Sequence, residues 1–163
     1  MTHRAIRLFG DPVLRSACDP IAPGDPRAAG LVEDLLENVE IPGRAGLAAN
    51  QIGVGLRAFS FNVDGRIGYV INPEIVELGG EQVLVDEGCL SVPGFSFPRQ
   101  RHTFARVRGI DLEGEPVELE GEGLMAQMLQ HECDHLDGRL YIEGLKPEIK
   151  REAMRAIRQA PWF

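Results

Sequence analysis

The sequence lacks a long apolar run. No window of its 163 residues approaches the roughly eighteen apolar residues that a membrane-spanning helix needs. The N-terminal segment MTHRAIRLFGDP also lacks the apolar core of a signal peptide. These two absences predict a protein of the cytoplasm.

Positive charge is scarce. The chain has 17 Lys and Arg against 25 Asp and Glu, which gives a formal net charge of -8. A field of this sign excludes general attraction to nucleic-acid phosphates or to anionic lipid, so we expect no direct nucleic-acid binding and no membrane partner. The hydrophobic fraction of 44% is nevertheless ordinary for a globular protein, which excludes disorder as the default state.

Cysteine is also scarce, and the three residues are Cys18, Cys89 and Cys133. An odd number at wide spacing excludes a disulfide framework and leaves at least one thiol free to act as a metal ligand or nucleophile. Cys18, in a loop-like segment, is interpreted as a small hydrophobic residue. The chain is long enough for one domain, residues 1–163, that folds without a metal as a staple, so any metal would serve chemistry.

Three segments of the chain have helical periodicity, one before and two after a β-rich centre. Asp25 and Pro26 predict an N-cap and a first helical residue, followed by apolar residues at helical spacing up to a stop at Pro42-Gly43. A second helix is predicted from Leu124 to Leu136, and a terminal one from about Pro147 to Gln159.

The centre of the chain alternates apolar and polar residues, which predicts strands. Residues 59–63 and 69–71 flank Asp64-Gly65 and predict a hairpin, and residues 75–78 and 82–85 flank Gly79-Gly80 and predict a second strand pair. Alternation also predicts strands around residues 105–107 and 117–119. The turns are too short for repeated crossovers, so the expected fold class is α+β, with mostly antiparallel or mixed sheets packed around a central buried helix.

The motif QHECDHLDG, residues 130–138, carries the chemistry of the second predicted helix. Four residues apart on a helix, His131 and His135 can direct two imidazole nitrogens at one metal ion, and Glu132 can serve as an acid and base beside it. Cys133 points to the opposite side of the helix, where a packed thiol is the better interpretation.

The third ligand has several candidates. In extended metalloprotease patterns it lies downstream, but Tyr141 stands where a histidine is needed. Glu143, Glu148 and Glu152 follow, although Gly138 ends the helix before them. Upstream, Cys89 follows a predicted strand, and a thiolate with two imidazoles leaves one position open for catalysis.

Three separated motifs of the chain resemble those of peptide deformylases, the enzymes that remove the N-terminal formyl group from new bacterial proteins. The motifs are GLAANQ at 46–51, EGCLS at 87–91 and QHECDHL at 130–136, with further similarity in GDPVLR at 10–15, VPG at 92–94 and Arg101. The resemblance covers most of the chain. One departure is Arg44, which stands where the family usually has glycine and predicts a differently shaped loop at the substrate groove.

The resemblance implies the roles of specific residues. Cys89, His131 and His135 would hold one divalent ion, ferrous iron in the cell, although zinc, nickel and cobalt suit the same ligands. Glu132 would move protons while water attacks the formyl carbon, and the Gln51 amide and the Leu90 backbone N–H would donate to the formyl oxygen.

The expected substrate is a formyl-methionyl peptide that lies extended beside two glycines and places its methionine side chain in an apolar pocket. The residues expected to line this groove are Ala45, Gly46, Val85, Gly88, Leu124 and Met128. The alternatives are a zinc endopeptidase or a non-enzymatic, metal-stabilised binding module. A basic C-terminal helix, between Lys146 and Arg158, is a candidate for docking to the ribosome, with a solvated amphipathic helix as the alternative.

Overall fold

The computed structural model describes residues 3–163, so the first two residues of the segment considered for a signal peptide lie outside it. Five antiparallel strands form one sheet in the order β1-β2-β3-β4-β5. The elements in chain order are η1 (Pro12–Arg15), α1 (Ala28–Val39), β1 (Gly46–Ala48), η2 (Ala49–Ile52), β2 (Ala58–Val63), β3 (Arg66–Gly88), β4 (Ser96–Ile110), β5 (Pro116–Glu122), α2 (Gly123–Leu136), η3 (Tyr141–Gly144) and α3 (Pro147–Ile157). The α+β prediction is confirmed.

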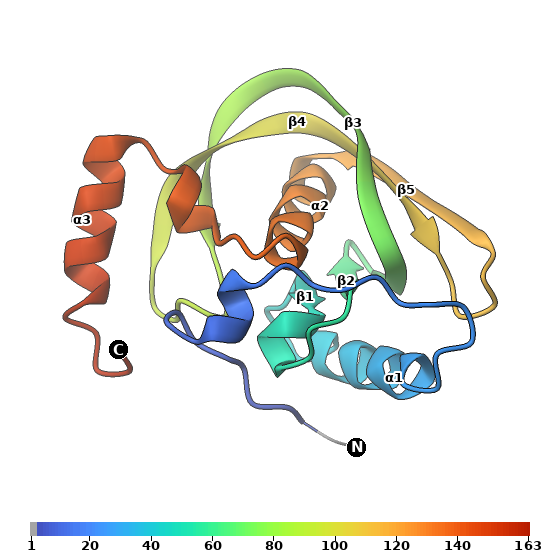
Figure 1. Ribbon diagram of the computed structural model, residues 1–163. Helices are drawn as coiled ribbons and strands as arrows, with labels where there is room; N and C mark the ends of the chain where they lie inside the picture. The colour runs from blue at the N-terminus through green and yellow to red at the C-terminus, as the bar shows by residue number, and fades with distance from the viewer. Residues whose placement is uncertain (1–2) are drawn as a thin grey trace.

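Strands β3 and β4 form a long curved hairpin that arches over α2 (Figure 1). The predicted second strand pair is wrong, because residues 75–78 and 82–85 belong to the single strand β3 and both segments pair with β4. Gly79-Gly80 forms a register shift instead of a turn, and Gly80 has a φ of 69°. Such irregularities bend a strand, and the sheet thereby curves around the helix.

The two faces of β1 and β2 bury different helices. Phe59, Phe61 and Val63 belong to a core cluster with α2, whereas Ala58 belongs to a second cluster with α1. On the α1 side the Ser60 hydroxyl donates to the Leu35 carbonyl at 2.8 Å. Because both faces are covered, nearly all of β2 is buried, and α2 is enclosed between this part of the sheet and the arch.

The start of α1 differs from its prediction. The helix begins at Ala28 with Arg27 as its N-cap, two residues later than the predicted Asp25 cap. The Asp25 side chain accepts a hydrogen bond from the Arg27 N–H at 2.9 Å, and its carbonyl accepts from the Ala28 N–H at 3.1 Å. Asp25 thus accepts both hydrogen bonds within a turn over Pro26 that precedes the helix, instead of capping the helix itself.

The end of α2 is held against the N-terminal segment. The helix is followed by Gly138, whose φ is 78°, and the Leu136 carbonyl accepts from the Cys18 N–H at 2.8 Å. A Cβ at Gly138 would lie 2.9 Å from the Arg15 carbonyl oxygen and 3.0 Å from the Ala17 nitrogen. Only glycine fits this approach, which fixes the end of the helix that carries both histidines. Among residues 3–163, every helix is too short or too polar to cross a membrane.

We predict that Gly138→Ala lowers the free energy of unfolding by about 2–5 kcal/mol, because left-handed backbone costs an alanine about 1–2 kcal/mol and the overlap with fixed backbone adds about 1–3 kcal/mol. Gly114→Ala is the matched control, since Gly114 has a φ of 79° but open space around it. It should show the backbone cost alone. Urea unfolding of both variants measures the difference, and equal losses would contradict the role of the contact.

Candidate metal centre

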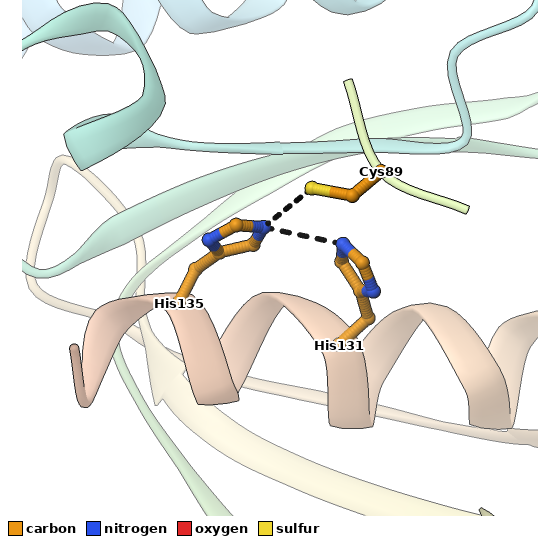
Figure 2. A group of neighbouring side chains, drawn as sticks. All are labelled: Cys89, His131 and His135. Carbon is orange, nitrogen blue, oxygen red and sulfur yellow. Dashed lines mark hydrogen bonds between the residues drawn. The ribbon is translucent and has the colours of Figure 1, made fainter. Parts of the chain in front are cut away.

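Three potential ligands converge from two elements that lie far apart in the sequence. Cys89 follows directly after β3, and His131 and His135 lie one turn apart on α2. The Cys89 Sγ is 3.3 Å from the His135 Nε2, which is 3.2 Å from the His131 Nε2 (Figure 2). Within residues 3–163 this is the one group of three such side chains whose ligand atoms all lie within 4.8 Å of one another.

The donor set fits a divalent transition metal. Tetrahedral ligands at normal Zn–N and Zn–S bond lengths lie about 3.3–3.6 Å apart, close to the two shorter separations here. Burial lowers the pKa of His135 well below its ordinary value, so its imidazole is neutral and has a lone pair to offer. Burial alone would lower the pKa of His131 too, but Cys89 and Glu87 raise it well above the ordinary value. The surroundings of His131 thus favour a positive charge at the cluster. A bound metal cation can supply this charge in place of a proton on His131.

A buried chain of charges orients His131. Its Nδ1 is 2.7 Å from the Glu87 Oε2, and Glu87 also accepts two hydrogen bonds from the Arg101 guanidinium, at 2.7 and 2.8 Å. Arg101 in turn donates to Asp134 at 2.9 Å. Burial alone would raise the pKa of Glu87, but the bonds from Arg101 and His131 lower it to about 2. The resulting carboxylate holds the Nδ1 proton of His131, so that Nε2 faces the ligand cluster.

Glu132 lies beside the ligand cluster with an unused oxygen. Its side chain is buried and lines a cavity, and its Oε2 has no hydrogen-bond partner within the described structure. Burial raises its pKa to about 7. A Cβ at Gly46 would lie 2.7 Å from the Glu132 Oε1, so the absence of a side chain on β1 makes room for the carboxyl group.

The Gln51 amide has a fixed orientation. Its Oε1 accepts from the Ala48 N–H at 3.0 Å, which directs its Nε2 to the Ser91 hydroxyl at 3.1 Å and to the Cys89 sulfur at 3.7 Å. The Ser91 N–H lies 3.4 Å from the same sulfur. Leu90 lines the cavity next to these groups. Two amide N–H donors, from Gln51 and Ser91, thus face the sulfur.

The other candidates for a third ligand lie outside the cluster. Glu143, Glu148 and Glu152 are exposed, because the chain after Gly138 leads through η3 to α3 on the outside of the molecule. Tyr141 is buried with its ring centroid 6.0 Å from that of His131, and its hydroxyl has no partner among the described residues. Cys18 and Cys133 are both buried in the apolar core, and burial raises the pKa of each thiol.

A cavity of about 520 Å³ opens beside the cluster, and Cys89 and His131 are among the residues that line it. Its lining includes five of the six residues expected around the substrate, namely Ala45, Gly46, Gly88, Leu124 and Met128. Val85 is not among them, because it lies three residues before Gly88 on the arch, where it pairs with Arg99. The expectation that Val85 lines the groove is therefore not met by the observed lining.

Two further residues that the sequence did not mark hold α2 in place. The Gln130 amide both donates to and accepts from the backbone of His102 on β4, at 3.0 and 3.1 Å. The buried Asn50 on η2 donates to the His135 carbonyl. Both lie within the quoted motifs, but only the tertiary arrangement assigns them these partners.

Comparisons with known proteins agree with this geometry. The sequence profile of the polypeptide deformylase family matches residues 3–151. A peptide deformylase from Acidothermus cellulolyticus is 50% identical over 162 residues, covering 99% of this chain and 89% of that protein, and one from Parafrankia sp. is 45% identical over 163 residues, with coverage of 99% and 89%.

Solved structures give the same result. The crystal structure of a peptide deformylase from Legionella pneumophila matches with a TM-score of 0.88 and 35% identity, covering 97% of this chain and 95% of that one. The enzyme from Thermus thermophilus matches with a TM-score of 0.88 and 39% identity, covering 96% and 94%. This chain therefore belongs to the polypeptide deformylase family.

Proposed function

We propose that residues 1–163 form a single catalytic domain that acts in the cytoplasm on formyl-methionyl peptides. The reaction is that of its family: water adds to the formyl carbon, the C–N bond breaks, and formate and a free amino terminus result. The observation that carries the assignment to this site is the convergence of Cys89, His131 and His135 beside the free oxygen of Glu132. The chain is thus a metal-dependent hydrolase of protein biosynthesis.

Cys89, His131 and His135 hold the ion in this proposal. When bound, a divalent ion supplies a Lewis acid that polarises the formyl carbonyl and makes water a better nucleophile. One thiolate and two neutral imidazoles accept iron(II), zinc, nickel and cobalt alike. We infer iron(II) in the cell, and metal content per chain after anaerobic purification, measured together with activity, tests that identity.

Glu132 moves the protons. Its side chain lines the cavity and its Oε2 has no partner among the described residues, so the carboxyl group can take a proton from the attacking water and deliver it to the leaving nitrogen. Negative charge then develops on the formyl oxygen. The Gln51 Nε2, whose direction the Ala48 N–H fixes, and the Leu90 backbone N–H are the donors proposed for that oxygen.

The cavity next to the ligands accommodates the start of the peptide. Leu124 and Met128 offer apolar surface to the methionine side chain from α2, and Ala45 does so from the loop before β1. Gly46 and Gly88 expose backbone on either side, where an extended peptide can form hydrogen bonds.

We predict that Glu132→Gln lowers formate release from formyl-Met-Ala-Ser by about 10²–10⁴-fold, because the amide cannot accept the proton of water. The metal content should stay at the wild-type level. Glu143→Gln, on an exposed side chain, is the control and should keep full activity. Cleavage of an unformylated peptide by the wild-type protein would favour an endopeptidase, and undiminished activity of the Glu132→Gln variant would contradict the role of the carboxyl group.

A second prediction concerns the carboxylate behind His131. Glu87→Gln removes the charge that holds the His131 ring, so metal affinity should fall about 10–100-fold. Competition with a chelator measures this affinity. Glu77→Gln, which weakens an exposed ion pair with Arg106, should leave it unchanged. Equal affinities in all three proteins would show that Glu87 does not orient the ligand.

Docking to the ribosome is proposed for α3. Five basic side chains at or near this helix are exposed, namely Lys146, Lys150, Arg151, Arg155 and Arg158. Its other side packs through Ala153 and Ile157 into a separate apolar cluster, so the basic residues face away from the core. A cationic surface on an otherwise acidic protein favours a polyanionic partner.

We expect that exchanging Lys150, Arg151 and Arg155 for Glu reduces cosedimentation with ribosomes at least about tenfold, because attraction becomes repulsion. Charge exchange is preferable to removal of residues 147–163, which would uncover the apolar cluster. Activity on formyl-Met-Ala-Ser provides the control for folding. Unchanged cosedimentation would leave α3 as a solvated helix.

A further inference from the structure

Arg44 brings a charge to the substrate cavity. It lies in the loop between α1 and β1, is half-buried, and lines the cavity together with the neighbouring Gly43 and Ala45. The other ionisable side chains of this lining, Cys89, His131 and Glu132, belong to the proposed metal and proton-transfer groups. Of the ionisable residues in this lining, Arg44 is therefore the one to which neither metal binding nor proton transfer assigns a role.

The Arg44 guanidinium is anchored, but among residues 3–163 it forms no ion pair. Its Nη1 donates to the Asn38 carbonyl, in the last turn of α1, at 2.9 Å. Burial lowers its pKa, and no carboxylate of residues 3–163 offsets this cost. By comparison, the partly buried Arg57 and Arg106 form ion pairs with Asp137 and Glu77, both at 2.8 Å. A desolvated cation without a partner in an acidic protein favours an anion from outside the chain.

The path of the substrate leads past this cation. β1 is one of the two edge strands of the sheet, and a Cβ on its first residue, Gly46, would lie 2.7 Å from the Glu132 Oε1 beside the ligand cluster. Arg44 lies two residues before Gly46. An extended peptide advances about 3.3 Å per residue, so a peptide with its formyl group at the cluster and its chain along β1 reaches Arg44 within its first three residues.

We infer that Arg44 is a specificity-determining residue, which selects formyl-methionyl peptides with an acidic side chain at the second or third position. This inference rests on the proposed function. The fork of the guanidinium can still donate to a carboxylate from Nη2 and Nε while Nη1 holds Asn38. Because the pair is partly exposed, the preference should be about fivefold in kcat/KM and should decline with added salt.

The test compares three peptides with amidated C-termini: formyl-Met-Ala-Ser, formyl-Met-Glu-Ser and formyl-Met-Ala-Glu. The wild-type enzyme should release formate from one of the acidic peptides with a kcat/KM about five times that for the neutral one. Arg44→Gln keeps a donor for Asn38 but loses the charge, so the ratio should fall to about one. Arg44→Lys keeps the charge and should retain part of the preference.

Arg106→Gln is the matched control, because it changes the net charge equally but lies on β4 away from the cavity, and it should keep the wild-type ratio. Calorimetric binding of the product peptides Met-Ala-Ser, Met-Glu-Ser and Met-Ala-Glu, also amidated, to wild-type and Arg44→Gln proteins gives a readout without turnover. The same acidic preference should be present in the first protein and absent from the second.

The same measurements distinguish failure of the proposed function from failure of the inference about Arg44. If the metal-loaded protein releases no formate from any of the three peptides, the proposed function fails. If the protein hydrolyses them, and the ratio of kcat/KM for acidic and neutral peptides does not differ between wild type and Arg44→Gln, the inference about Arg44 is overturned. The residue then serves only to hydrogen-bond the Asn38 carbonyl in the last turn of α1.

Discussion

The buried carboxylate of Glu87 is the constraint on which the centre depends. It lies at the end of β3, two residues before Cys89, and it contacts His131 on α2. The strand that delivers the sulfur and the helix that delivers the imidazoles are therefore joined by a direct hydrogen bond. Arg101 completes the arrangement, because a carboxylate that is 1% exposed would otherwise be a large desolvation cost. Loss of one partner of such a pair typically costs about 3–5 kcal/mol.

The same helix is also fixed from Gln130 to its end. Gln130 joins it to β4, Asn50 joins its last turn to η2, and the glycine after it packs on the N-terminal segment. The arch of β3 and β4 covers it from the other side (Figure 1). A catalytic group must be held within a fraction of an ångström of its working position, and a helix restrained by three elements meets that demand better than a loop.

The sequence predicted those parts of the structure that depend on local periodicity. The extents of α2 and α3 and the hairpin of β2 and β3 follow from spacing and turn residues, and the structure confirms them. The interpretation of Gly79-Gly80 as a turn was wrong because glycine marks a bulge as readily as a turn, and only pairing with β4 decides between them. The start of α1 was wrong because the Asp25 side chain closes a turn of its own.

Some features of the site could likewise be predicted from the sequence, and others required the structure. Motif spacing placed His131 and His135 on one helix face, but the proximity of Cys89, the partner of Glu87 and the free oxygen of Glu132 are tertiary facts. Val85 lies close to Gly88 in sequence, yet of the two only Gly88 is among the residues that line the cavity. Arg44 could be noticed from the sequence as a departure from the family, yet only the structure shows that no carboxylate of the described part of the chain pairs with it.

The central claim is that one sulfur and two imidazoles bind the same ion in the working enzyme. X-ray absorption spectroscopy of reduced, active protein loaded with a single metal tests it most directly, with formate release measured on the same sample. The account predicts one sulfur at about 2.3 Å and two imidazole nitrogens at about 2.0–2.1 Å from the ion. Full activity without sulfur among the atoms bonded to the metal would contradict it.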